Sequence, residues 1–429
     1  METGSSADLI VNSNSIDSES TVKGLSMLTA AIFIVGEMSG TGVLSLPKAM
    51  EQSNWSGLAL ILGCCALSGY CGIRLSSCWT MILEKDSSLK HGVRDPFSVI
   101  AFEAAGKLGR LIVEISSYIQ LFGVAVIFLL IAAHNFASLF DMFFFHFCDW
   151  TIAITILMAP VAMLGTPKDF WPIAVGAMLF TGFACILIFA QSMRQISDPL
   201  PPNDPVTFNS FFVSFGTILF CFGGAVMFPT IQSDMINPSQ FYKSVILSYL
   251  IMLLFYLPVG IAGLVVFAGL TKDNIIDNLQ DNWIKTTVLI LITGHLLTAF
   301  TIILNPVFQG VEKVFNAPIN FSAKRVLIRS CILISVLFVA QSVPNFGPIL
   351  SFIGGSTVSL TSFILPCIFY ILLCRKSKYS KVVSKLEMLA LFLCVVISAI
   401  GGAISTYSSI DALVSPTTFV PPCYFNRTQ

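Results

Sequence analysis

Charged side chains are scarce in this chain of 429 residues, because Asp, Glu, Lys and Arg together make up only 11% of it. A soluble protein carries about 25% charged residues, so a large water-soluble domain is not expected. Histidine is also scarce, with four residues, and none lies near a nucleophile or base partner in the sequence. A membrane-embedded enzyme such as an acyltransferase is therefore not predicted. With no nucleic-acid or phosphate-loop motif present, we expect no enzymatic activity, no cofactor and no nucleic-acid partner.

Hydrophobic residues, by contrast, make up 55% of the chain and include 37 phenylalanines. They form long runs instead of the alternating pattern of an outer-membrane barrel, and a run of about 20 residues spans a bilayer as a helix. The sequence therefore predicts an all-α polytopic membrane protein with about eleven transmembrane helices. The predicted spans are 24–50, 55–82, 109–139, 150–166, 170–192, 209–236, 242–270, 285–311, 326–342, 348–374 and 387–409.

Lysine and arginine are distributed unevenly between the predicted loops. With the N-terminus in the cytosol, most of the 23 basic residues fall on the cytosolic side, chiefly in 85–110, 313–329 and 375–385. Cytosolic loops of membrane proteins carry this excess of positive charge, so the N-terminus is predicted to be cytosolic. The basic segment 375–385 marks the topology and offers a contact for anionic membrane lipid. Plasma membrane and acidic organelle membrane both stay open as locations.

The two ends of the chain are predicted to lie on opposite sides of the membrane, because the number of spans is odd. Residues 1–22 are rich in Ser, Asn, Asp and Glu and lack the apolar core of a signal peptide, so we expect a disordered cytosolic tail. Residues 410–429 would form a non-cytosolic tail, where Asn426 begins an N-glycosylation acceptor sequence. Of the twelve cysteines, only Cys148 and Cys423 are placed outside the membrane on that side, which predicts a disulfide between them. No metal-binding cysteine motif occurs.

The apolar run 24–50 is interrupted by the segment Gly36-Glu37-Met38-Ser39-Gly40-Thr41-Gly42. Glycine in a helix interior costs about 1 kcal/mol relative to alanine, and a carboxylate at the centre of a membrane helix costs about 2.5–3.5 kcal/mol on insertion scales. Such a segment is tolerated where the helix is broken and the freed backbone lines a polar cavity. Transporters build binding sites at the membrane midplane in this way, so the segment indicates solute transport.

A second interruption lies in the run 209–236, which contains Gly223 and Gly224 and then Pro229. Proline removes a backbone donor and clashes with the preceding turn, so this helix is expected to break near Gly223. Paired interruptions at equivalent places in two halves are the sequence sign of an inverted-repeat transporter, although close-packing glycines offer an alternative explanation. The transporter domain, 23–409, would then comprise repeat one (24–192), repeat two (209–374) and an additional helix (387–409).

Three motifs of the chain resemble those of the amino acid/auxin permease family. The stretch Gly40–Met50 is similar to the first-helix signature of that family, and the Phe-Gly-Gly…Pro of 222–229 and the segment 295–310 are similar to later ones. The resemblance covers about residues 23 to 407. It implies an eleven-helix fold of five-plus-five inverted repeats and one additional helix, with the first and sixth helices broken. It also implies secondary active transport of amino acids by alternating access.

An amino acid zwitterion needs hydrogen-bond donors for its carboxylate and acceptors for its ammonium group. We expect the backbone N–H groups of Gly40, Thr41 and Gly42, at the start of the second half-helix, to bind the carboxylate. Carbonyl groups at the ends of the broken helices would accept from the ammonium group, namely those of Gly36, Ser39, Phe220 and Cys221. The family resemblance adds Tyr118 and Thr298 as candidate contacts of the substrate side chain.

Coupling to protons is expected from the residues before the Gly-x-Gly motif. Sodium-coupled members of the family carry an asparagine four positions before it, and here Gly36 occupies that position, followed by Glu37. A membrane-buried carboxyl group can exchange a proton near neutral pH, so Glu37 is the candidate proton carrier unless it only pairs with another buried group. His295 is a second candidate, with packing as its alternative role. Two alternative functions are sodium-coupled amino acid transport and a non-transporting amino acid sensor on the same fold.

Overall fold

The computed structural model describes residues 24–90, 95–140, 145–163, 171–197, 199–318, 321–379, 381–415 and 420–425. Within these ranges every regular element is helical, apart from one isolated bridge between Leu25 and Met235. The all-α prediction is therefore confirmed. The predicted tail 1–22 and the acceptor residue Asn426 lie outside the described residues.

The helices overlap the predicted apolar runs, although α4 already begins at Pro96 and bends at Gly106, before the predicted run 109–139. The α-helices are α1 (Met27–Met38), α2 (Gly42–Ser53), α3 (Ser56–Lys85), α4 (Pro96–Leu139), α5 (Phe147–Met163), α6 (Trp171–Arg194), α7 (Phe208–Cys221), α8 (Phe228–Ser233), α9 (Phe241–Ala262), α10 (Trp283–Val314), α11 (Ala323–Ser342), α12 (Phe346–Ile353), α13 (Leu365–Arg375) and α14 (Lys385–Val414). The 3₁₀ elements are η1 (Ser87–Lys90), η2 (Gly224–Val226), η3 (Pro238–Gln240), η5 (Ala268–Leu270) and η6 (Ile275–Asn278), and the π-helical elements are η4 (Gly263–Phe267) and η7 (Gly354–Ile364).

Eight helical stretches of the described chain are long and apolar enough to cross a membrane, and the bent pair α1 and α2 adds a ninth if it counts as one span. The helix α5 is apolar but has only 17 residues, which gives about 25 Å of helix against a hydrocarbon core of about 30 Å. The helix α11 is not among the candidates, and its first turns carry Lys324, Arg325 and Arg329. The count of about eleven spans therefore stays a prediction.

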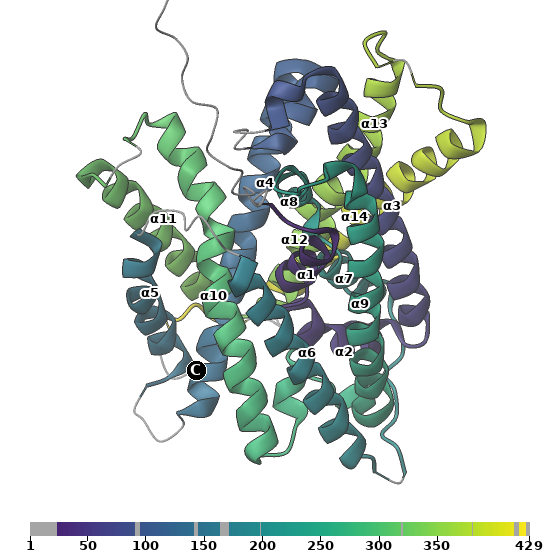
Figure 1. The fold of residues 1–429 in the computed structure, drawn as a ribbon. Coiled ribbons are helices and arrows are strands. Elements are labelled where there is room, and N and C mark those ends of the chain that lie inside the picture. Colours follow the sequence, from purple (N-terminus) through teal and green to yellow (C-terminus); the bar gives the residue numbers. More distant parts are fainter. Residues whose placement is uncertain are drawn as a thin grey trace, which may run out of the picture.

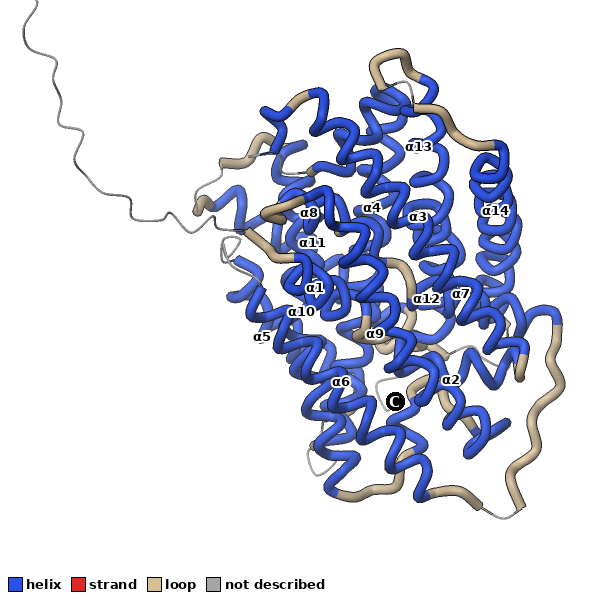
Figure 2. Tube along the Cα trace, turned by 45° about the vertical axis from the view of Figure 1, so that its right-hand side comes forward, coloured by secondary structure: helices blue, strands red, loops and turns tan. Residues whose placement is uncertain are grey.

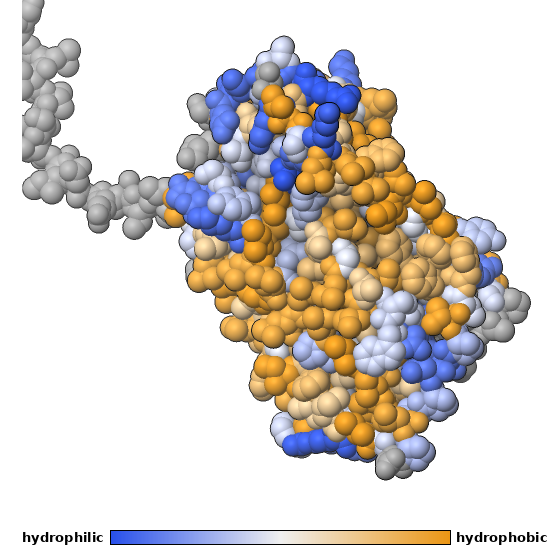
Figure 3. Space-filling model, turned by 90° about the vertical axis from the view of Figure 1, so that its right-hand side faces the viewer, coloured by the Kyte–Doolittle hydropathy of each residue, from blue (hydrophilic) through white to orange (hydrophobic). Residues whose placement is uncertain are grey.

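The face of the molecule seen in Figure 3 has an apolar band between two polar ends. Large apolar side chains point outward from several helices, including Ile186 of α6, Leu254 of α9 and Ile400 of α14. Continuous apolar surface of this extent marks contact with a membrane or a partner, and here it lies on helices long enough to span a bilayer. The protein is an integral membrane protein with several membrane-spanning helices.

Two interrupted helices occupy the middle of the bundle (Figures 1 and 2). The axes of α1 and α2 differ by 61°, and α7 passes into the turn η2 before α8 begins. The two breaks touch, because the Cys221 thiol lies 3.4 Å from the Gly42 carbonyl oxygen. Around them, α1 and α2 pack against α9, α10 packs against α4 and α6, and η7 packs against α7 and α14. Both predicted interruptions therefore meet at one place in the fold.

Local sequence explains how these segments begin and how they approach one another. The Ser26 hydroxyl accepts a hydrogen bond from the Thr29 N–H and caps α1, and Thr207 and Ser210 cap α7 reciprocally. A Cβ atom added at Gly354 would lie 1.9 Å from the carbonyl oxygen of Gly216. Since small residues allow membrane helices to approach closely, η7 crosses α7 at this point only because position 354 is glycine.

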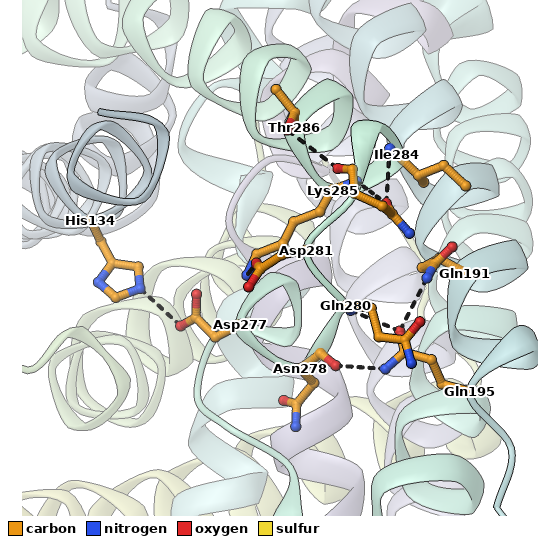
Figure 4. Close-up of polar contacts among 11 residues, drawn as sticks. His134, Gln191, Gln195, Asp277, Asn278, Gln280, Asp281, Ile284, Lys285 and Thr286 are labelled. Atoms are coloured by element: carbon orange, nitrogen blue, oxygen red, sulfur yellow. Dashed lines mark hydrogen bonds and ion pairs between the residues drawn. The ribbon is translucent and has the colours of Figure 1, made fainter. Parts of the chain in front are cut away.

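Polar loops and a disulfide gather at the end of the bundle where α4 ends and α5 begins. His134 Nε2 of α4 lies 2.9 Å from Asp277 Oδ2 of η6 (Figure 4). The side chain of Gln195 binds the same loop, because it donates to the Asn278 carbonyl oxygen. Beside them Cys148 forms a disulfide with Cys423, with a Cα–Cα distance of 5.7 Å. The loop between α9 and α10 is thereby attached to α4 and α6.

Candidate substrate-binding site

A cavity of about 60 Å³ lies between the two helix breaks. Five residues singled out in the sequence line it, namely Glu37, Gly40, Thr41, Phe220 and Gly223. The other lining residues are Met38, Gln120, Leu121, Val124, Phe128, Gly224, Val226, Met227, Ile303 and Val358. The lining is therefore mostly apolar, with a few polar groups at the breaks, which is the usual composition of a small-molecule pocket.

The first break leaves backbone donors without partners. The helix α2 begins at Gly42, and the Thr41 side chain makes no capping hydrogen bond. Among the described residues, the N–H groups of Gly40, Thr41 and Gly42 donate to no backbone carbonyl. Free N–H groups at a helix N-terminus favour a negative charge, which the helix dipole stabilises further. The first break therefore offers an anion-binding position at the edge of the cavity.

The second break has its carbonyl groups already bonded to the protein. The hydroxyl of Tyr256 on α9 lies 3.2 Å from the Cys221 carbonyl oxygen and 3.1 Å from that of Met38, so it connects the two breaks. The Gln120 amide donates to the Gly223 carbonyl oxygen at 2.9 Å. The Cys221 carbonyl, which we expected to accept from a substrate ammonium group, thus accepts from Tyr256.

Gln120 is fixed in place by a second hydrogen bond. The Thr361 hydroxyl, which belongs to the π-helical element η7, donates to Gln120 Oε1 at 2.5 Å. Gln120 is almost fully buried and comes from the middle of α4. Its amide therefore joins α4, η7 and the second break in one polar contact beside the cavity.

Glu37 is the one acidic side chain among the described residues that line the cavity. The ion pairs found in the described part of the chain do not include it. Ionisable groups inside the membrane usually face a cavity or pair with one another, and they are functional by default. Glu37 faces the cavity without a basic partner, so its carboxyl group is available to a ligand or a proton.

His295 of α10 lies behind the first break and does not line the cavity. Its side chain is fully buried, and Nδ1 is 3.2 Å from both the Ala177 carbonyl oxygen and the Thr181 hydroxyl. Its Nε2 has no hydrogen-bond partner in the described structure. A Cβ atom added at Gly40 would lie 2.5 Å from this nitrogen, so the imidazole packs directly against the break.

Three further residues of the first break are not among those that line the cavity. Gly36 packs against α6, where an added Cβ would lie 2.4 Å from the Ala174 carbonyl oxygen. Gly42 packs against Cys221, whose sulfur would be 3.0 Å from an added Cβ. The Ser39 hydroxyl is buried with no hydrogen-bond partner among the described residues. Gly36 and Gly42 therefore permit close helix contacts, and only their backbone groups can serve a substrate.

The two contacts implied by the family resemblance lie elsewhere. Tyr118 of α4 packs against Gly310 of α10, where an added Cβ would be 2.4 Å from the phenol ring. The Thr298 hydroxyl donates to the carbonyl oxygens of Gly294 and His295 in its own helix. Neither side chain is among the residues that line the cavity.

Sequence reasoning missed the polar residues that hold the breaks together, namely Gln120, Tyr256 and Thr361. Their only signal in the sequence is a polar side chain inside an apolar run. Buried polar groups are almost always hydrogen-bonded, so each of them called for a partner. The sequence alone does not say which helix supplies that partner.

Residues 23–411 match the family described as transmembrane amino acid transporter protein. The chain belongs to this family. The amino acid transporter AVT1B of Arabidopsis thaliana is 25% identical over 392 residues, which cover 89% of this chain and 70% of the relative. Lysine histidine transporter-like 1 of the same organism is 26% identical over 370 residues, covering 81% of this chain and 80% of the relative.

Solved structures share the fold of this transmembrane amino acid transporter at low sequence identity. MhsT, solved in complex with L-phenylalanine, has a TM-score of 0.62 at 15% identity, covering 90% of this chain and 99% of MhsT. The Eremococcus coleocola manganese transporter has a TM-score of 0.61 at 14% identity, covering 91% and 87% of the two chains. The family and the transporter fold predicted from the sequence are thus confirmed.

Proposed function

We propose that this protein is a secondary active transporter that carries an amino acid together with protons by alternating access. One observation carries the proposal: the Glu37 carboxyl group lies at one cavity between two broken helices together with Gly40 and Thr41, whose N–H groups donate to no backbone carbonyl among the described residues. Donors and an acid at the same cavity match the two charged groups of an amino acid zwitterion.

The substrate would bind with its two charges on opposite partners. Its carboxylate lies at the N–H groups of Gly40, Thr41 and Gly42, where the helix dipole favours an anion. Its ammonium group lies towards Glu37. Its side chain meets the apolar lining provided by Val124, Phe128, Ile303 and Val358, so an uncharged side chain is preferred. MhsT, which shares the fold, was solved with an amino acid bound.

Proton coupling follows from placing an ammonium group beside a carboxyl group that can also bind a proton. Substrate binding changes the proton affinity of Glu37, and linkage makes the effect reciprocal. A proton gradient can thereby drive substrate accumulation. His295, whose unpartnered Nε2 lies against Gly40, would carry the proton past the first break.

We propose the topology of the sequence analysis for this transporter. Repeats 24–192 and 209–374 insert with opposite orientation, helix 387–409 is additional, and the N-terminus is cytosolic. The basic loop between α13 and α14 lies at the end of the bundle opposite the loop between α6 and α7 (Figures 1 and 2), which supports the assignment. The membrane is the plasma membrane or that of an acidic organelle. Epitope tags at the two ends, probed in intact and permeabilised vesicles, should report opposite sides, and tags on the same side would contradict the topology.

Transport assays with purified protein in liposomes test the function. A panel of labelled amino acids is offered with a pH gradient or a sodium gradient imposed separately. We expect uptake that needs the pH gradient, and Glu37→Gln should abolish this dependence while exchange of labelled for unlabelled substrate continues. The matched control is Glu114→Gln, because Glu114 is on α4 away from the cavity and pairs with Arg110.

The outcomes separate the alternatives. Uptake that follows the sodium gradient and ignores pH would show a sodium-coupled transporter. Unchanged pH dependence in Glu37→Gln would remove Glu37 from the coupling step. Substrate binding without any flux would show a sensor instead of a transporter.

A further inference from the structure

Three buried cysteines from three different helices meet outside the lining of the substrate cavity. Cys71 lies on α3, Cys367 on α13 and Cys394 on α14, and their exposed fractions are 0%, 0% and 2%. The sulfurs of Cys71 and Cys367 are 3.5 Å apart, and all three sulfurs lie within 4.8 Å of one another. Among the described residues, no carboxylate or imidazole belongs to this group. The donor set is therefore entirely sulfur.

We propose that Cys71, Cys367 and Cys394 form a binding site for the cuprous ion. Sulfur ligands select soft metals such as Cu(I) and zinc. Structural zinc takes four ligands in a tetrahedron, whereas the cuprous ion is stable with two or three sulfurs. Because the site offers three buried sulfurs and lies in a dry interior, Cu(I) fits the donor set better than zinc.

The observed sulfur positions are close to those of a trigonal site. A metal–sulfur distance of about 2.3 Å places the three sulfurs of such a site about 4.0 Å from one another. This separation falls between the 3.5 Å of the closest pair and the 4.8 Å limit of the trio. Small rotations of the side chains therefore suffice, and the three helices keep their places.

Binding of the cuprous ion balances by release of protons alone. When Cu(I) binds to two thiolates and one thiol, two protons leave and the site carries one negative charge, with no electron transferred. Arg74, three residues beyond Cys71, lies on the same face of α3. Its Nη1 is 2.7 Å from Glu387 of α14 and 3.4 Å from the Tyr370 hydroxyl of α13. The ion pair of Arg74 with Glu387, together with Tyr370, thus joins the same three helices about one turn from the sulfurs.

The bound ion would fasten α14 to the rest of the bundle. A ligand that binds only the folded protein stabilises it by mass action, and metal affinity adds to folding free energy in the same way. The sequence shows no metal motif because the three cysteines are far apart along the chain and become neighbours only when α3, α13 and α14 pack together.

Competition titration of the purified, reduced full-length protein tests this site. Cu(I), kept reduced with ascorbate, is offered in the presence of a coloured Cu(I) chelator. We expect one tightly bound equivalent, whose affinity rises with pH because protons are released. Outer-sphere changes at metal sites cost about 10–100-fold in affinity, so Cys71→Ser and Cys394→Ser should each weaken binding by about 100-fold or more. The matched control is Cys78→Ser, because Cys78 is equally buried on α3 but lies outside the trio.

Two outcomes would overturn the proposal. One is Cu(I) affinity that is the same in the wild type, Cys71→Ser and Cys394→Ser. The other is a Cys71–Cys367 disulfide in mass spectra of the protein as purified, with no Cu(I) binding after reduction. If the serine variants fail to fold, two measurements on the wild-type protein test the proposal. X-ray absorption of the copper-loaded protein should show sulfur ligands at about 2.3 Å, and alkylation after brief denaturation should find these three thiols protected but not Cys78.

Discussion

The two broken helices of this transporter differ in how the backbone groups at their breaks are hydrogen-bonded. At the first break the N–H groups of Gly40, Thr41 and Gly42 donate to no backbone carbonyl in the part of the chain that the structure describes. At the second, the carbonyl groups of Cys221 and Gly223 accept hydrogen bonds from Tyr256 and Gln120. Unsatisfied backbone groups are costly inside a membrane, so a break that stays unsatisfied indicates a place for a ligand. The first break is therefore the candidate binding element, and the second is a support that fixes the cavity wall.

The largest effect is expected when the first break is blocked. In Gly42→Leu, the new side chain meets Cys221, since even a Cβ atom would lie 3.0 Å from its sulfur. The two breaks must then separate, and we expect uptake to be abolished while the protein stays in the membrane. Uptake into liposomes, with size-exclusion profiles, measures both. The matched control is Gly63→Leu, where nothing lies within 4 Å of an added Cβ; normal uptake by Gly42→Leu would contradict the assignment of the first break.

A smaller effect is expected when the hydroxyl that joins the breaks is removed. Tyr256→Phe keeps the ring but leaves the carbonyl groups of Met38 and Cys221 without their donor. A buried group left unsatisfied costs about 1–3 kcal/mol, so we expect a lower melting temperature and slower transport. Thermal unfolding in detergent measures the first effect. Tyr242→Phe serves as the control because Tyr242 is exposed on the same helix. Equal losses of stability and transport in both variants would show that the hydrogen bonds of the Tyr256 hydroxyl are not the cause.

Loss of the hydrogen bonds that Gln120 makes at the second break should mainly weaken substrate binding. Gln120→Leu removes the donor to the Gly223 carbonyl oxygen and the acceptor of Thr361. We expect KM to rise about tenfold, equivalent to about 1.4 kcal/mol, with kcat less affected. Because both residues act through one contact, Thr361→Val should add little to Gln120→Leu in a double-mutant cycle. Fully additive effects would show that the two side chains act independently.

The smallest effect is expected for the direct contact between the breaks. The Cys221 thiol lies 3.4 Å from the Gly42 carbonyl oxygen, and a thiol is a weak donor. Cys221→Ala should therefore change the unfolding free energy by about 1 kcal/mol or less and leave uptake close to normal. A loss of transport as large as that of Gly42→Leu would mean that the thiol itself contributes to binding.

The sequence predicts where the two helices break, but it does not predict which side chains hydrogen-bond to the breaks. Glycine, proline and an acid inside an apolar run are visible locally, so the interruptions near Gly40 and Gly223 could be found without a structure. The bond from Gln120 to Gly223 joins residues 103 positions apart, and the bond from Thr361 to Gln120 spans 241 positions. Such pairs depend on which helices pack together. Tyr118 and Thr298, taken from the family resemblance, are not among the residues that line the cavity.

The disulfide between Cys148 and Cys423 can form only late in the synthesis of this protein. Its two cysteines are separated by 275 positions, so the ribosome must finish α5 to α14 before the bond can close. The Cys423 N–H donates to the Gln341 carbonyl oxygen, and the Gln341 amide donates to the Cys148 carbonyl oxygen, so the disulfide lies at the contact between α5 and α11. A Cys148–Cys423 disulfide can therefore be present only in chains synthesised as far as Cys423, and a gel shift on reduction would distinguish chains that carry it from those that do not.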